Sequence, residues 1–419
     1  MAAAPATGAT RRRLTQQDVE LICARHDRLF SARMGGARAV FAFADLSGLD
    51  LSGRNLSDAD FTGATLLDTR LVGTRLDNAS FFGADMQGAN LSEASLRRAD
   101  LRGACLRGAN LTGADLFEAD LREGAIASPD RDKGLRIIEH ATRAGDAHGA
   151  ILAGANLERS RLSGVVAVKA DFSDAIMKDA KLVRANLKQA NLNGANLAGA
   201  DLSGADVSGA DLRDVVLVGA KTLAWTVGNA DMTGVLTDEP SGKALNDLPY
   251  EDMLRDHARW CESGGAEGKP SAFDRADLRG LKSIRGYDLT ALSARGAVFY
   301  GLDMEGVQLQ GAHLEGADLR GCNLRRADLR GARLARAKLS GADLRDAHLG
   351  PLLIAADRLL PCDLTGAQLK AADLARADLR QAVLAGADLS RANFTGAQTR
   401  GVDLAGAVRH GARGLDGVI

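Results

Sequence analysis

A period of five residues governs most of this sequence. A Leu, Phe or Met recurs at every fifth position, Asp or Asn precedes it, and Ala stands two positions before it, so the unit is A-[D/N]-L-x-x. The frame runs from Leu46 to Ile126, from Leu157 to Met232 and from Leu289 to Leu404. A long α-helix is excluded, because five residues advance by about 500° and would scatter the Leu side chains around the axis. An ordinary strand, which alternates with a period of two, is also excluded.

The repeat can be satisfied by a square coil. If each unit forms one short side and then turns a corner, four units close a coil of about 20 residues. Leu and Ala then point inward, whereas Asp or Asn and the two residues after Leu face water. Gly recurs at the second position after Leu, where a corner benefits from its freedom in φ. Because aromatic residues make up only 4% of the chain, the interior must be narrow and built from small residues and Leu.

Two runs carry a resemblance to a known family: ANLNGANLAGADLSGAD at 190–206 and ADLRGCNLRRADLRGARL at 317–334. They closely resemble the pentapeptide-repeat family, and the resemblance covers about two thirds of the chain. It implies an all-β solenoid, a right-handed quadrilateral β-helix. It says little about function, because one fold can carry many activities.

Two segments outside the repeat predict amphipathic α-helices that share one pattern. Their apolar stripes have identical offsets, with Val19, Cys23 and His26 in the first and Tyr250, Leu254 and His257 in the second. Thr15 is a candidate N-cap, and both helices run into a Gly pair. An open β-helix end exposes backbone groups and apolar core, so each helix is expected to cap a coil.

These features predict two cap-plus-coil units. The segments are a disordered tail at 1–13, a capping helix at 14–36, a β-helix at 44–126, a short helical insertion at 127–150, a β-helix at 151–237, a linker and second capping helix at 238–272, a β-helix at 273–412 and a tail at 413–419. The apolar stretch 215–228 marks the end of the first coil and is a candidate docking site for the second helix. Coaxial stacking of the two units and their independence remain open alternatives.

Composition limits the class of partner and compartment. The net charge of −1 makes DNA binding an unfavoured interpretation, and no apolar run of 18 residues predicts a membrane span. The basic cluster near the N-terminus lacks the apolar segment of a signal peptide. Five widely spaced cysteines favour a reducing compartment, so the cytoplasm is expected. The excess of Arg over Lys and the many Ala residues indicate a bacterial source with a GC-rich genome.

Several residues with reactive side chains are better explained by structure than by chemistry. His26 and His257 are interpreted as half-buried, hydrogen-bonded cap residues. Cys322 and Cys362 are predicted to be small core residues on the same face, two coils apart, whereas Cys105 replaces an outward Asp and is a candidate surface thiol. The Asp and Asn columns lack the Gly-Gly-x-Gly-x-Asp units of calcium-binding repeats. No catalytic, cofactor-binding or metal-binding residue is nominated, and an enzyme is not expected.

Charge and exposed apolar residues select a candidate contact surface. Residues 44–126 carry 13 acidic and 8 basic side chains, whereas residues 289–409 carry 13 acidic and 16 basic ones. Sorting by a 20-residue coil places a basic stripe on two adjoining faces: Arg295, Arg320, Arg333, Arg336, Lys338, Arg358, Arg376, Arg380 and Arg400. The segment GPLLIAADRLLPC at 350–362 puts Leu353 and Leu360 at positions that should be exposed. A solvated face with local ion pairs, and a bulge that packs on itself, are the alternatives.

The residues selected as partner contacts are Leu353, Arg358, Leu360, Arg320, Arg336, Arg376 and Arg380. The predicted function is a non-enzymatic interaction or scaffold module that presents a rigid rod to a protein partner. The family resemblance implies an alternative, a DNA-mimic regulator of type II topoisomerase (gyrase) that protects against quinolones or toxins. Those relatives are strongly acidic and dimerise through a C-terminal helix, whereas this chain ends in AVRHGARGLDGVI. A homodimer formed through one end of a coil is a further hypothesis.

Overall fold

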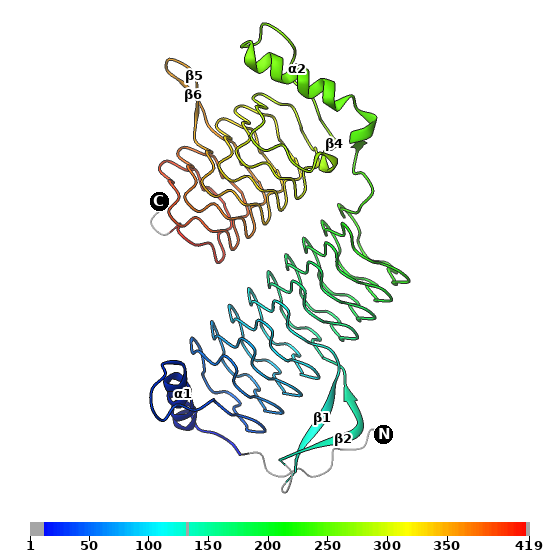
Figure 1. The fold of residues 1–419 in the computed structure, drawn as a ribbon, viewed down its shortest axis with the longest axis vertical. Helices are drawn as coiled ribbons and strands as arrows, with labels where there is room; N and C mark the ends of the chain where they lie inside the picture. Colours follow the sequence, from blue (N-terminus) through cyan, green and yellow to red (C-terminus); the bar gives the residue numbers. More distant parts are fainter. Residues whose placement is uncertain (1–11, 131–133, 416–419) are drawn as a thin grey trace. The chain divides into compact units, whose positions relative to one another are not determined.

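The computed structural model describes residues 12–130 and 134–415. The chain divides into two compact units, Met1–Asp238 and Glu239–Ile419, and each has its own hydrophobic core. The repeat segments of each unit wind into stacked coils (Figure 1). Parallel bridges join the residue before each Leu to the residue 20 positions later, as in Asp60 with Ser80 and Asp318 with Lys338. Since a bridge recurs at every fifth residue, four pentapeptides complete one coil.

The repeat unit explains the backbone of each side. The Leu91 N–H donates to the Asn110 carbonyl (2.7 Å) in the next coil, and the Asn110 N–H donates to the Ala89 carbonyl (2.9 Å) in the previous one. The Asn110 side-chain oxygen also accepts the N–H of Thr112 (3.0 Å). Asp and Asn therefore have a local structural role, since this Asx turn starts the corner. At the corner the backbone takes a positive φ, as at Gly113 (67°).

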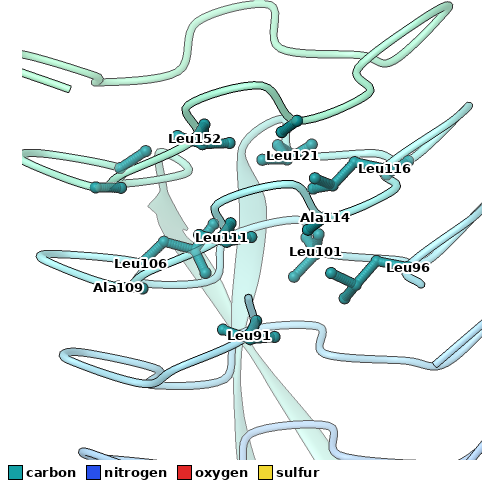
Figure 2. Packing of buried hydrophobic residues seen from close by; sticks show 14 of the residues in the cluster. Leu91, Leu96, Leu101, Leu106, Ala109, Leu111, Ala114, Leu116, Leu121 and Leu152 are labelled. Atoms are coloured by element: carbon teal, nitrogen blue, oxygen red, sulfur yellow. The ribbon is translucent and has the colours of Figure 1, made fainter. Parts of the chain in front are cut away.

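The interior of the coils is filled by the inward residues of the repeat. Figure 2 shows Leu side chains of successive coils pointing toward one another, with Ala beside them. Leu91, Leu111 and Leu152 are 0–1% exposed in three consecutive coils. The first unit also stacks aromatic rings, since Phe61 lies 4.9 Å from Phe41 and 4.7 Å from Phe81 between ring centroids.

The first capping helix, α1 (Gln16–Phe30), packs on the core of the first unit. It begins at Thr15, whose hydroxyl accepts the Asp18 N–H while the Asp18 carboxylate accepts the Thr15 N–H, which is a capping box. His26 is fully buried, and its Nδ1 accepts the N–H of Ala39 (3.0 Å).

The second helix, α2 (Tyr250–Glu262), packs on the core of the second unit in the same way. His257 is fully buried, and its Nδ1 accepts the N–H of Ser271 (2.8 Å). In the same unit, β3 (Lys243–Ala244) pairs in parallel with β4 (Ala276–Asp277), and two 3-10 turns, η1 (Leu245–Asp247) and η2 (Arg279–Leu281), follow these strands. Neither α1 nor α2, the α-helices of the described residues, is long and apolar enough to cross a membrane.

The helix predicted within 127–150 is wrong. The structure instead has an antiparallel pair, β1 (Gly124–Asp130) with β2 (Gly134–Arg143). The sequence favours this outcome, because Pro, Asp and Gly, the residue types at 129, 130 and 134 where β1 ends and β2 begins, favour turns, and β-branched residues such as Ile are typical of strands. The pair leaves the first unit's coil after Glu123, and the coil resumes at Asp146, which bridges to Cys105.

A second pair leaves the second unit's coil. Strand β5 (Leu352–Ala355) pairs in an antiparallel manner with β6 (Arg358–Leu360). Arg333 bridges to Asp363, a separation of 30 residues instead of 20. The β5–β6 hairpin therefore removes ten residues from the coil, which preserves the five-residue frame but moves every later residue by two sides.

The predicted tails lie mostly outside the described residues. At their described ends, Arg13 bridges to Asp45 and Arg413 bridges to Asn393, so both residues belong to coils.

Candidate interaction surface

The β5–β6 hairpin presents the apolar residues of the candidate surface. Leu353 is 64% exposed, Ile354 45% and Leu359 49%, and Figure 1 shows the hairpin projecting from the coil. Leu360, which the sequence predicts to be exposed, is half-buried instead. The sequence did not indicate Ile354 and Leu359, because both fall in the Leu frame of the repeat, which predicts an inward side chain. Leu359 could have been found by reading 352–360 as a hairpin. Leu359 pairs with Leu353, and residues that pair across two strands lie on the same face.

The base of the hairpin is packed, not loose. A Cβ added at Gly331 would lie 2.7 Å from Leu352 Cβ and 3.2 Å from Leu360 Cδ2, so both side chains rest on a bare corner of the coil. The Gly331 N–H also donates to the Gly350 carbonyl (3.3 Å). A fixed base with an exposed apolar tip distinguishes this segment from a bulge that packs on itself. Arg358 is exposed and begins β6.

The structure divides the predicted basic stripe. Because the hairpin shifts later residues by two sides, Arg376 and Arg380 lie on the sides opposite Arg336 and Arg320. The ladder shows this directly, since Lys338 bridges to Gln368 whereas His348 bridges to Asp378, the neighbour of Arg380. The prediction of one stripe on two adjoining faces is therefore wrong, and its error is the assumption of an uninterrupted 20-residue coil.

Local ion pairs neutralise most of these arginines. Arg320 is only 6% exposed and makes a two-pronged contact with Asp318, with Nε to Oδ1 at 2.8 Å and Nη2 to Oδ2 at 2.5 Å. Arg380 contacts Asp378 in the same way, at 2.9 and 2.7 Å. This hydrogen bonding from Arg380 is the main cause that lowers the pKa of Asp378. An Asp-x-Arg sequence thus cancels its own charge within one side of the coil.

Arg376 is paired across coils. Its Nε and Nη2 donate to the two carboxylate oxygens of Asp346, both at 2.8 Å, and this lowers the pKa of Asp346. Arg376 and Arg380 border a hollow of about 460 Å³ together with Arg330 and His348. Arg336 is exposed on the other side, so of the five predicted arginines only Arg376 and Arg380 line this hollow.

The cysteines correct two further predictions. Cys105 is 1% exposed, and burial raises its pKa, so it is not a surface thiol. Cys322 and Cys362 are both buried, but the hairpin shift places them on opposite sides. Burial raises the pKa of Cys322 to about 12. Among residues 12–130 and 134–415, no group of three or more His, Cys, Asp or Glu side chains could hold a metal ion.

The two cap histidines are hydrogen-bonded, as the sequence predicts, but they are fully buried and not half-buried. Burial is the main cause that lowers the pKa of His26 and of His257, so the neutral ring is preferred. In each ring Nδ1 accepts a backbone N–H, which assigns the proton to Nε2. They are structural residues that join a helix to the first strands of a coil.

Comparison with known proteins identifies the repeat. The sequence profile described as pentapeptide repeats matches eight times, over residues 39–78, 59–98, 74–113, 94–124, 146–179, 180–218, 312–350 and 362–398. These ranges cover more than half of the chain. The chain belongs to the pentapeptide-repeat family. No curated protein matches it in sequence.

Several solved pentapeptide-repeat structures are similar to this chain. Rfr23 from the cyanobacterium Cyanothece 51142 is 27% identical, with 33% of this chain and 88% of that chain covered and a TM-score of 0.25. HetL from the cyanobacterium Nostoc sp. strain PCC 7120, a protein involved in heterocyst differentiation regulation, is 24% identical, with 94% and 97% covered and a TM-score of 0.16. QnrB1, a plasmid-mediated fluoroquinolone resistance protein, is 19% identical, with 54% and 98% covered and a TM-score of 0.18.

Proposed function

We propose that this pentapeptide-repeat protein is a non-enzymatic interaction module of the bacterial cytoplasm, in which right-handed, four-sided coils hold a contact surface for a protein partner. The β5–β6 hairpin is the observation that carries the proposal. Leu353, Ile354 and Leu359, which define the apolar tip, are exposed together on a hairpin that projects from the coil. Exposed apolar clusters with a polar surround mark sites of protein contact.

The chemistry of the tip indicates the kind of partner. Asp357 in the turn and Arg358 at the start of β6 carry opposite charges, so the tip has no net charge and contact must depend on apolar burial. Burial of an aliphatic side chain contributes about 1.5–3 kcal/mol. Three such side chains on a fixed base fit an apolar groove on a folded protein. The packed base lowers the entropy lost on binding, because the hairpin is already ordered.

The test replaces the tip and keeps the base. The triple variant Leu353→Ser, Ile354→Ser and Leu359→Ser removes the exposed apolar atoms and leaves Leu352 and Leu360 on Gly331, so thermal stability should be unchanged. The matched control is Leu223→Ser in the first unit, which removes a Leu that is 78% exposed. Proteins retained by each immobilised full-length chain from bacterial lysate would be quantified by mass spectrometry.

The proposal expects a partner that the wild type and the control retain and the triple variant loses by about tenfold or more, a loss of about 1.4 kcal/mol or more. A photo-crosslinking residue at position 354, but not at position 223, should then join covalently to that partner. Identical sets of retained proteins from all three chains would refute the hairpin as the contact. Retention of gyrase by all three would instead favour the topoisomerase alternative, with its contact elsewhere on the coil.

A further inference from the structure

The first unit contains a basic groove that is independent of the hairpin surface. Two adjoining hollows of about 500 and 720 Å³ share Arg122 and Ser163 and lie across two adjoining sides of four successive coils. Their lining includes seven basic and four acidic side chains. By contrast, residues 44–126 of the same unit carry 13 acidic and 8 basic side chains. The groove therefore concentrates positive charge on a coil that is otherwise acidic.

A departure from the repeat creates the positive charge. The ladder position before Leu carries Asp100, Asp120 and Asp201 in this column, but Arg161 and Lys181 occupy it in the two coils between Asp120 and Asp201. Arg161 bridges directly to Lys181, and among the described residues no other bridge outside the named strands joins two Lys or Arg residues. Like charges placed opposite each other in a sheet are destabilising. A local cost of this kind is expected where a site serves binding.

The cations of the groove differ in how strongly they are already paired. Arg122 is held by Asp120 at 2.9 and 2.7 Å, and Arg159 contacts Glu118 at 2.8 Å. Arg161, in contrast, reaches Asp120 only at 3.8 Å and is 57% exposed in its side chain. Arg161 therefore keeps most of its hydrogen-bonding capacity toward the groove.

Small residues open the space between these charges. Ser163 and Gly164 follow Leu162 at the corner where the previous coil has Arg122 and Glu123 and the next has Val183 and Arg184. The missing side-chain volume produces the hollow beside Arg161 and Lys181. A carboxylate that enters it would face cations from two coils, and charge-assisted hydrogen bonds of this kind are stronger than neutral ones.

We propose that this groove binds an acidic segment of a protein partner, in extended conformation along the coil axis. Four coils span about 15 Å, because neighbouring strands lie about 4.8 Å apart, and this matches about five extended residues. A nucleic acid fits less well, since Glu118, Asp120, Glu123 and Asp179 also line the groove and would face its evenly spaced phosphates. A peptide can place its carboxylates beside Arg161 and Lys181 and its amides beside the acids.

The test restores the ordinary repeat residue. The double variant Arg161→Asp and Lys181→Asp carries the residue found at Asp120 and Asp201, so it should fold. Lys221→Asp is the matched control, since Lys221 bridges to Asp201 in the same column but does not line the groove. Binding of a fluorescent peptide of about eight residues, alternating Glu and Ser, would be measured by anisotropy, because about five extended residues span the groove.

Binding to the wild type should weaken as salt rises, and the double variant should bind about tenfold or more weakly while the control stays within about twofold, as for loss of a charged contact. A peptide with Gln in place of Glu should not bind. Equal binding by the double variant and the wild type, or by the Gln peptide, would overturn the proposal. Tighter binding of a single-stranded oligonucleotide, lost in the same double variant, would assign the groove to nucleic acid and also overturn it.

Discussion

The two units begin with the same cap, but the caps are seated differently. In α1 the buried residues are Val19, Cys23 and His26, and a capping box closes the first turn. In α2 only His257 is fully buried, and Pro249 precedes the helix without a side-chain hydrogen bond. The shared element is the ring that accepts a backbone N–H of the first coil. The variable element is the apolar area that the helix buries.

This difference indicates how a coil end is closed. A histidine contact fixes where the helix lies, because Nδ1 must meet one particular N–H group, that of Ala39 or that of Ser271. Apolar burial then determines how firmly the helix is held. Since α1 buries more and is capped, the first unit should keep its helix under conditions in which the second unit releases it.

The cores of the units differ as well. The first unit stacks Phe41, Phe61 and Phe81 in three successive coils, whereas Phe299 and Phe394 of the second unit belong to different columns. Replacing Phe61 by Ala should therefore lower the free energy of unfolding of the first unit by about 3–5 kcal/mol, through lost burial and an internal cavity. Hydrogen exchange with mass spectrometry in increasing urea would measure each unit separately.

The control for this prediction is Phe82→Ala, which removes a half-buried ring on the outside of the next coil, beside Arg102. Phe82→Ala should lower the free energy of unfolding of the first unit clearly less than Phe61→Ala does. Protection of the second unit should not change in either variant, because its core is separate. If both units lose protection together, the division into two independent cores is wrong.

Acid should distinguish the caps next. Burial lowers the pKa of both rings from 6.5, so the unfolded chain binds more protons and stability is lost as pH falls below about 6.5. Protonation replaces an acceptor by a donor, which costs about 1–3 kcal/mol for the N–H left unpaired. Among the charged neighbours, Asp27 and Asp58 raise the pKa of His26 and Arg38 lowers it. Asp288 raises the pKa of His257.

We expect α2 to lose hydrogen-exchange protection at a higher pH than α1. The variants His26→Asn and His257→Asn keep an acceptor near the position of Nδ1 but do not titrate, so each should remove the pH dependence of its own helix between about pH 7.5 and 5.5. Equal protection of both helices across this range would show that the difference in burial does not determine cap stability. Persistence of the dependence in the Asn variants would assign it to the Asp residues instead.

The sequence contains most of the fold because each repeat specifies its own geometry. Leu points inward, Asn110 forms an Asx turn and Gly113 turns the corner, so a local pattern predicts a long-range coil. The hairpins were hidden for different reasons. β1–β2 interrupts the frame without a helix-forming pattern, whereas β5–β6 keeps the frame because it takes ten residues out of the coil, a multiple of five.

The candidate site could be predicted less well from the sequence, for the same reason. An insertion of ten residues leaves the five-residue period unchanged in the sequence. It nevertheless moves Arg376 and Arg380 to the opposite side of the coil. The groove at Arg161 and Lys181 was also missed. Its signal was present in the sequence, since two successive coils replace Asp by a cation at one ladder position.

The smallest effect concerns the cap of α1 alone. Thr15→Ala removes the hydroxyl that accepts the Asp18 N–H and should lower the stability of the helix by about 1 kcal/mol. Glu20→Ala on the exposed side of the same helix is the control and should change stability by less than about 0.5 kcal/mol. Exchange of the α1 amides at neutral pH would measure both. If the capping box helps to make α1 the firmer cap, Thr15→Ala should bring its protection toward that of α2; an unchanged difference would assign all of it to the burial of Val19 and Cys23.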